Sequence, residues 1–404
     1  MKYILITIIA IILNCLLLTP YIKEPAPEDK EETHQTTQTT EQQYQDNQSI
    51  EDITVDCLIS VPEINKHDGV YEYYYTQLQS NQHQTTYREI YNLIKNQNTS
   101  ITIEITSNQT VADIIKLFRL IQMDHPELYY TQEIKYITHP TNNTVTIYPV
   151  YTFSSSEKIQ ADKELKEYTE KFNTALSSNL TKPYIDTEIE EFIYQYITTN
   201  TEYNLTSPNN QNLYSVVQGE SVCLGYSKMF KYLCDKNNIP CMVVRGKTKE
   251  QPNKTDESGH AWNKVYIANQ WYITDLTTEK NMLQEFNTAT QNYKLNITDE
   301  LHSKQYEEEN ISTNHIKITL PECNSIEKDW YNTKGVYITD FSEIENKIKE
   351  AQTNNQKELT IRTNSDETYQ TVVENINNIA KQTKSSQTSL IKCESLRLIR
   401  IVWR

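Results

Sequence analysis

Hydrophobic residues in the first half of the folded chain follow two spacings that predict helices and strands. Steps of three and four residues predict helices over 87–95 and 110–121. Alternation with polar residues predicts strands over 101–105 and 144–151. We therefore predict a small α+β module over 57–154.

The tail of the chain repeats this plan. Residues 343–349 resemble 89–95, and 359–361 resemble 101–103, with a second apolar stripe and a final alternating strand behind them. We predict a C-terminal α+β module over 291–404 that is a weak repeat of the first module. Only a handful of identities support the repeat, so chance similarity is the alternative. Neither module holds a cluster of reactive side chains, which favours a binding or spacing role.

The centre of the chain has a pattern of its own. Helical spacing predicts a long helix over 156–180, a second over 185–197 and a third that begins at Cys223. Strand-like runs follow at 241–244, 260–267 and 271–275. These elements predict a central α+β domain over 155–290.

The first 56 residues have a different composition. The run from Tyr3 to Ile22 has no charged residue and is long enough to span a bilayer as a helix. Residues 23–56 are acidic, rich in Thr, Gln and Glu, and almost free of apolar residues, so we expect a disordered stalk. We expect 1–22 to be an uncleaved membrane anchor rather than a cleaved signal segment.

The residues beside this run predict its orientation. Lys2 precedes it and an acidic flank follows, which places the folded domains outside the cytoplasm. Ile12-Leu13-Asn14-Cys15 resembles a lipoprotein cleavage box, but Asn14 stands where a small residue is expected. A lipoprotein attached at Cys15 is therefore the less favoured alternative.

Composition limits the classes of partner. The chain has 404 residues and a formal net charge of −16, which argues against nucleic-acid binding because that needs clustered Lys and Arg. There is no CxxC, no HExxH and no calcium loop, so we expect no metal and no cofactor. The spacing of the seven cysteines does not predict a disulfide framework.

The candidate chemistry begins at Cys223. Four of the six glycines fall between 219 and 259, around this residue. A cysteine at a helix N-terminus meets unpaired N–H groups and the positive end of the helix dipole, which favour the thiolate. Cys223 is therefore our candidate nucleophile, and its own amide could face an oxyanion. Gln218 is a candidate side-chain donor to the same oxyanion.

His260 and Asp275 are the candidate partners of the thiol. If a two- or four-residue turn joins their strand-like runs, His260 lies opposite Thr277, with Asp275 as its diagonal neighbour on the same face. A shift of one residue would separate the two side chains. His260 would take the thiol proton and return it to the leaving group, and Asp275 would orient the imidazole.

Purely structural roles are the alternative for residues of these types. A cysteine on an apolar helix face is more often a small buried hydrophobe, and we read Cys234 and Cys241 in this way. Asp124 and His125 could form a catalytic pair, but they stand before Pro126, where a helix stop is the preferred interpretation.

Several motifs surround the three candidate residues. In chain order they are Gly219-x-x-Val222-Cys223-x-Gly225-Tyr226, Ile239-Pro240-Cys241, Gly246, Gly259-His260-Ala261-Trp262-Asn263 and Trp271-Tyr272-x-x-Asp275-x-Thr277. Together they resemble the transglutaminase-like superfamily, in its bacterial and often surface-anchored branch. The resemblance implies a papain-like α+β core, with a nucleophile helix beside antiparallel strands, and a triad of Cys223, His260 and Asp275. Thr278 and Glu279 stand where the family often has an aromatic residue, so the resemblance does not predict the details of the substrate pocket.

The resemblance and the residues together predict a cell-surface thiol enzyme that forms a thioester with protein or peptide amides. We favour a cysteine peptidase, with a protein-crosslinking transglutaminase as the alternative, because the sequence does not specify whether water or an amine receives the acyl group. Substrates would be proteins or peptides, including cell-envelope components. A non-catalytic adhesion or scaffold protein with an idle papain-like domain is the alternative from another class.

Overall fold

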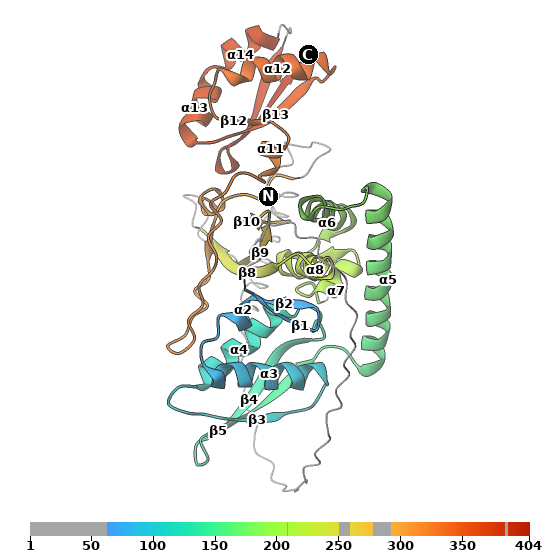
Figure 1. Ribbon diagram of the computed structural model, residues 1–404, viewed down its shortest axis with the longest axis vertical. Helices are drawn as coiled ribbons and strands as arrows, with labels where there is room; N and C mark the ends of the chain where they lie inside the picture. Colours follow the sequence, from blue (N-terminus) through green and yellow to red (C-terminus); the bar gives the residue numbers. More distant parts are fainter. Residues whose placement is uncertain (1–62, 208, 250–258, 278–291, 384–386) are drawn as a thin grey trace, which may run out of the picture.

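The computed structural model describes residues 63–207, 209–249, 259–277, 292–383 and 387–404, which form a mixed helical and antiparallel α+β structure (Figure 1). The α+β fold class predicted from the sequence is confirmed. The transmembrane anchor expected over 1–22 and the stalk expected over 23–56 lie outside the described residues. Among the helices of the described ranges, none is long and apolar enough to cross a membrane.

The N-terminal module packs two helices on a three-stranded antiparallel sheet with strand order β3-β5-β4. Its elements are β1 (Asn65–His67), β2 (Val70–Glu72), α2 (Tyr73–Thr76), α3 (Asn81–Lys95), β3 (Ile101–Glu104), α4 (Val111–Asp124), β4 (Thr131–His139) and β5 (Thr144–Tyr151). Helix α4 begins with a full capping box between Thr110 and Asp113. The sheet buries Ile103, Val145 and Ile147.

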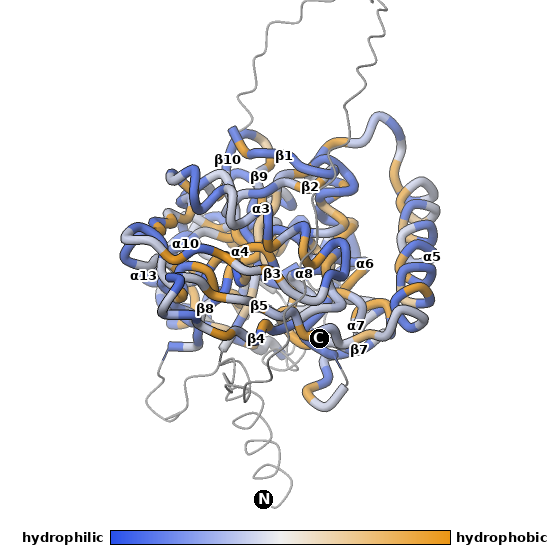
Figure 2. Tube along the Cα trace, turned by 90° about the horizontal axis from the view of Figure 1, so that it is seen from below, coloured by the Kyte–Doolittle hydropathy of each residue, from blue (hydrophilic) through white to orange (hydrophobic). Residues whose placement is uncertain are grey.

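The central part is built around a four-stranded antiparallel sheet with order β10-β9-β8-β11. Its elements are α5 (Ser155–Asn179), α6 (Asp186–Asn200), β6 (Glu202–Tyr203), α7 (Leu213–Val217), β7 (Glu220–Ser221), α8 (Cys223–Lys236), β8 (Cys241–Thr248), β9 (Gly259–Ile267), β10 (Gln270–Thr274), α10 (Asp299–His302) and β11 (Tyr306–Glu308). Helix α8 packs on this sheet, where Asn263 Nδ2 donates to the Ser227 carbonyl over 3.0 Å. In Figure 2, α5 stands at the edge with mainly polar positions.

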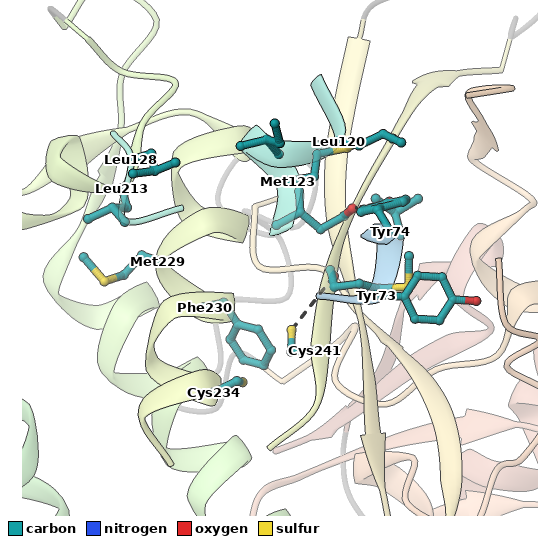
Figure 3. Packing of buried hydrophobic residues seen from close by; sticks show 14 of the residues in the cluster. Tyr73, Tyr74, Leu120, Met123, Leu128, Leu213, Met229, Phe230, Cys234 and Cys241 are labelled. Carbon is teal, nitrogen blue, oxygen red and sulfur yellow. Dashed lines mark hydrogen bonds between the residues drawn. The ribbon is translucent and has the colours of Figure 1, made fainter. Parts of the chain in front are cut away.

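One hydrophobic core runs through the N-terminal module and the central part. Figure 3 shows members of this core from both, including Tyr74 of α2, Met123 of α4 and Phe230 of α8. The buried Tyr74 hydroxyl donates to the Val243 carbonyl of β8 over 2.6 Å. The two parts are therefore joined by packing as well as by the chain.

The C-terminal module has a core of its own. Its elements are α11 (Trp330–Thr333), β12 (Tyr337–Ile338), α12 (Glu343–Thr353), β13 (Glu358–Thr363), α13 (Asp366–Glu374), α14 (Ile376–Thr383), β14 (Thr388–Cys393), the short 3₁₀ helix η2 (Glu394–Leu396) and β15 (Leu398–Trp403). Strands β13, β15 and β14 lie in the same order as β3, β5 and β4 of the N-terminal module. The shared order is compatible with the predicted repeat, and a duplication stays a prediction.

Most of the short strands were not predicted, and neither were two longer ones, β4 and β14. Strand β4 contains a register shift between Thr131 and Glu133, which breaks the alternation that would reveal it. Strand β14 places Leu390 and Ile391 next to each other, without a clear period of two. The second apolar stripe predicted for the C-terminal module, from Tyr369 to Ile379, spans two helices, because α13 ends at Glu374 and α14 begins at Ile376.

Candidate active site

Cys223 is the first residue of helix α8. The N-cap, Val222, has no side chain that can accept a hydrogen bond, so no side chain caps the first N–H groups of this helix. Gly225 lies in the first turn, where a Cβ would be 2.7 Å from the Asn212 carbonyl oxygen and 2.8 Å from Ser215 Oγ. Glycine is therefore needed for the loop before α8 to pack against the nucleophile end of the helix.

A two-residue turn places His260 and Asp275 together. Ala268 and Asn269 have φ values of 47° and 63°, as in a type I′ hairpin turn, and Asn263 pairs with Thr274. This is the register that the sequence argument required. His260 Nε2 lies 2.9 Å from Asp275 Oδ2. The hairpin thus brings together two residues that are 15 positions apart.

The Cys223 thiol is hydrogen-bonded to His260. Since Nε2 of the imidazole faces Asp275, Nδ1 is the nitrogen left for the thiol. Burial acts to raise the pKa of Cys223, but the bond to His260, its charge and the Ala261 N–H outweigh burial and lower this pKa. Burial acts to lower the pKa of His260, but Asp275 holds it well above its usual range. The geometry therefore favours a thiolate–imidazolium pair.

Asp275 has further partners that the sequence argument missed. Lys294 Nζ lies 3.0 Å from Asp275 Oδ2, and His302 Nε2 lies 3.4 Å from the same oxygen. Burial acts to raise the pKa of Asp275, but the charges of His260 and Lys294 hold it well below its usual range. Lys294 and Asp275 are both fully buried. No local motif marks Lys294 or His302, and only the fold brings them to the site.

Aromatic rings enclose the imidazole of His260. The ring of Tyr306, from β11, is stacked on it with centroids 4.2 Å apart, and the ring of His302 lies 4.8 Å from Tyr306. Lys294 Nζ lies 4.5 Å from the Tyr306 ring centroid. Burial lowers the pKa of His302 to about 4, so this second histidine is neutral at physiological pH. The stacked Tyr306 ring restricts the orientation of the His260 imidazole.

A cavity of about 60 Å³ opens at Cys223 and His260. The side chains that line it include Tyr203, Gln211 and Arg245. Gln218, the predicted oxyanion donor, does not line this cavity, because its amide donates to Glu164 Oε2 over 2.8 Å. The prediction for Gln218 is therefore wrong, and Gln211 is the glutamine that lies at the site.

The other cysteines and the Asp124–His125 pair lie elsewhere. Cys234 and Cys241 are buried in the shared core (Figure 3). His125 is the C-cap of α4, and its Nε2 lies 2.7 Å from Glu72 Oε1. Asp124 accepts from the Tyr74 amide over 3.1 Å. Within the described ranges, no group of three or more His, Cys, Asp and Glu side chains could hold a metal ion.

Comparison with known proteins finds a family match that covers the three candidate residues. The sequence model of the transglutaminase-like superfamily matches residues 170–276, which include Cys223, His260 and Asp275. Residues 170–276 form a transglutaminase-like domain. The resemblance seen in the sequence motifs is confirmed, and the α+β core around α8 and the antiparallel sheet is the structure of this domain.

Relatives of this domain are distant. Kyphoscoliosis peptidase of Mus musculus is 23% identical over 203 residues, which are 45% of this chain and 30% of the mouse protein. The Homo sapiens protein of the same name is 26% identical over 113 residues, which are 25% of this chain and 17% of the human protein. The chain therefore spans less than one third of these relatives. A crystal structure of a TGase is 14% identical, with 47% of this chain and 52% of that chain covered and a TM-score of 0.25.

Proposed function

We propose that this chain is a thiol enzyme that cleaves peptide amides through Cys223. The observation that carries the proposal is the unbroken contact from the Cys223 thiol through His260 to Asp275, beside a cavity. A lowered thiol pKa next to a raised imidazole pKa is the electrostatic arrangement that a nucleophilic cysteine needs.

The reaction follows from the positions of these groups. The Cys223 thiolate attacks the amide carbonyl carbon, and the N–H groups at the start of α8 stabilise the oxyanion. His260 gives its proton to the leaving nitrogen, so the C–N bond breaks and a thioester forms. Water then attacks the thioester, His260 takes a proton from it, and the acid and free thiol are released. Asp275 orients the imidazole and stabilises its cationic form.

Turnover of peptides tests this proposal. We expect the full-length chain to hydrolyse members of a quenched fluorescent peptide library, and Cys223→Ala to abolish hydrolysis. Cys234→Ala is the matched control, because it removes a thiol buried in the core and leaves the site intact. Equal activity of the wild type and Cys223→Ala would refute the proposed nucleophile.

The same thioester can pass its acyl group to an amine. A fluorescent primary amine added to the assay distinguishes a crosslinking transglutaminase from a peptidase, because only the former attaches it to a glutamine-bearing protein. We propose hydrolysis as the main outcome. If neither hydrolysis nor amine transfer depends on Cys223, the role of an idle scaffold, for which the two α+β modules provide binding surfaces, is the better explanation.

We further propose that residues 1–22 anchor the chain in the cell membrane and leave the folded part outside the cytoplasm, near cell-envelope substrates. The support is the uncharged run from Tyr3 to Ile22 behind Lys2. Protease added to intact cells should then remove the folded part. Full protection of the chain in intact cells, with digestion only after lysis, would contradict this location.

A further inference from the structure

Four basic side chains gather where the N-terminal module meets the central sheet. Lys116 and Arg119 come from α4, Lys228 from α8 and Arg245 from β8, three elements that lie side by side at this junction (Figure 1). We call these four residues the basic cluster. Such a concentration of positive charge is unexpected in a chain with a net charge of −16.

The basic cluster has little negative charge to balance it. Glu309 is the carboxylate next to it, and its oxygens lie 4.0 Å from Lys116 Nζ and 3.9 Å from Arg245 Nε, at the outer limit of an ion pair. Within the described part of the chain, the side chains of Arg119 and Lys228 have no hydrogen bond or ion pair. Counting only the residues that the structure describes, four cations and one carboxylate give a formal charge of +3 at this place.

Burial makes this arrangement unfavourable for the free protein. Lys228 is only 7% exposed, and the side chains of Lys116 and Arg245 are 13% and 23% exposed. Burial, with repulsion from Arg245, lowers the pKa of Lys228 to about 8. Burial also lowers the pKa values of Lys116 and Arg119, and Arg245 adds to this effect. Unpaired buried charges destabilise a fold, so a ligand of opposite charge would relieve the cluster.

Arg245 connects the basic cluster to the catalytic cavity. It lines the same cavity as Cys223 and His260. In the sheet it pairs with Ala261, and its neighbour Gly246 pairs with His260. A group held by Arg245 therefore lies beside the thiol. The other three cations of the basic cluster add to the positive potential that acts on this group.

We propose that the basic cluster recognises a carboxylate on the substrate, next to the acyl group that Cys223 attacks. The preferred acyl donor is then an acidic peptide, with an Asp or Glu side chain or a terminal carboxylate directed to Arg245. A carboxylate suits a guanidinium because the two planar groups can share two hydrogen bonds. This inference rests on the proposed function and narrows its substrate class.

Two alkylating reagents of similar size test the inference without turnover. Iodoacetate carries a carboxylate and iodoacetamide a neutral amide; both form a bond from Cys223 Sγ to their CH₂ carbon and release iodide. The rate of each reaction at Cys223 in the full-length chain is measured by mass spectrometry. We expect Arg119→Gln and Lys228→Met to lower the ratio of the iodoacetate rate to the iodoacetamide rate by about three- to tenfold each.

Lys166→Gln is the matched control, because it removes one positive charge from an α5 side chain that is 78% exposed. We expect it to leave the ratio unchanged. Lys228→Met should also raise Tm, since it removes a buried charge that has no partner.

The outcomes separate this inference from the proposed function. Cys223 could react rapidly with both reagents, with the same ratio of the iodoacetate rate to the iodoacetamide rate in the wild type, Arg119→Gln and Lys228→Met. This result would overturn the carboxylate site but would not contradict the proposed thiol enzyme. If Cys223 reacts slowly with both reagents, at the rate of an ordinary thiol, both proposals fail.

Discussion

At the scale of single residues, the unusual feature of this site is the number of groups around one carboxylate. Asp275 Oδ2 is within 3.4 Å of nitrogen atoms of His260, Lys294 and His302. Lys294 neutralises part of the negative charge that would otherwise act on His260 alone. The proton affinity of the His260 imidazole is therefore set by a lysine as well as by the aspartate.

Lys294→Met tests this influence. Without the ammonium, Asp275 stabilises the His260 imidazolium more strongly, so the pKa of His260 rises further. We expect the upper limb of the pH profile of kcat/KM for peptide hydrolysis to move to higher pH. Lys264→Met is the control, because Lys264 is equally buried but pairs with Asp299 and Glu308. An upper limb that stays in place in Lys294→Met would contradict the argument.

The same variant should change acid stability. The folded pKa of Asp275 is depressed, so its stabilising effect is present above the ordinary aspartate pKa and is lost as the pH falls through the lowered value. Loss of Lys294 makes the depression smaller. Acid unfolding of Lys294→Met, followed by circular dichroism, should therefore begin at a higher pH than that of the wild type.

The three candidate catalytic residues could be named from the sequence because each lies in a local pattern. Cys223 starts an apolar helix stripe, and His260 and Asp275 lie on two strands whose register a short turn determines. Lys294, His302 and Tyr306 could not be found in this way. They belong to α10, β11 and the chain before them, which only the tertiary fold brings beneath Asp275.

At the scale of elements, the position of the thiol depends on how helix α8 begins. Gly225, in the first turn of α8, is closely surrounded by three oxygen atoms: Ser221 Oγ, Asn212 O and Ser215 Oγ. Gly225→Ala would force these atoms apart and move the first turn of the helix. We expect a loss of about 1–3 kcal/mol in the free energy of unfolding and a marked loss of Cys223 reactivity.

Urea denaturation and iodoacetamide labelling measure the two effects. A suitable control is Ser227→Ala, one turn after Cys223 along α8, where the hydroxyl donates to the Cys223 carbonyl of its own helix. If Gly225→Ala retains wild-type stability and labelling, the close packing around the start of α8 is not what positions the thiol.

Elements with strong periodicity were predicted well, and those with irregular pairing were not. Helix α5 and strand β9 lie within one or two residues of the predicted bounds. Strand β8 continues to Thr248 because its polar end pairs with β11, a contact from a segment nearly 60 residues later that no local pattern reveals. The edge pairing of β11 is also what brings Tyr306 to His260.

At the scale of the whole molecule, two large hydrophobic cores divide the described chain, and a small third cluster shares Trp330 with the first and Val336 with the second. The first joins the N-terminal module to the transglutaminase-like domain, and the second belongs to the C-terminal module. The predicted boundary near residue 154 therefore separates two sheets but does not separate two cores, because the first core contains residues from both sides of it. Cys223 depends for its position on the first core.

Two substitutions of buried isoleucines test this division. Ile361→Ala, in the C-terminal core, and Ile121→Ala, in the shared core, should each reduce local stability by about 2–5 kcal/mol. We expect hydrogen exchange to increase in the C-terminal module alone for Ile361→Ala, and on both sides of residue 154 for Ile121→Ala. Faster exchange around α8 in Ile361→Ala would contradict two separate cores.

The central claim is that His260 activates the Cys223 thiol, and the pH dependence of alkylation tests it most directly. Iodoacetamide labelling of Cys223 is measured from pH 5 to 10 in the full-length wild type and in His260→Ala. The wild-type rate should reach its plateau below the pKa of an ordinary thiol, about 8.5. In His260→Ala the Ala261 N–H remains but the larger effect of His260 is lost, so the midpoint should move above that value and the rate at neutral pH should fall about 100-fold. Equal midpoints near that of free cysteine in both proteins would contradict the account.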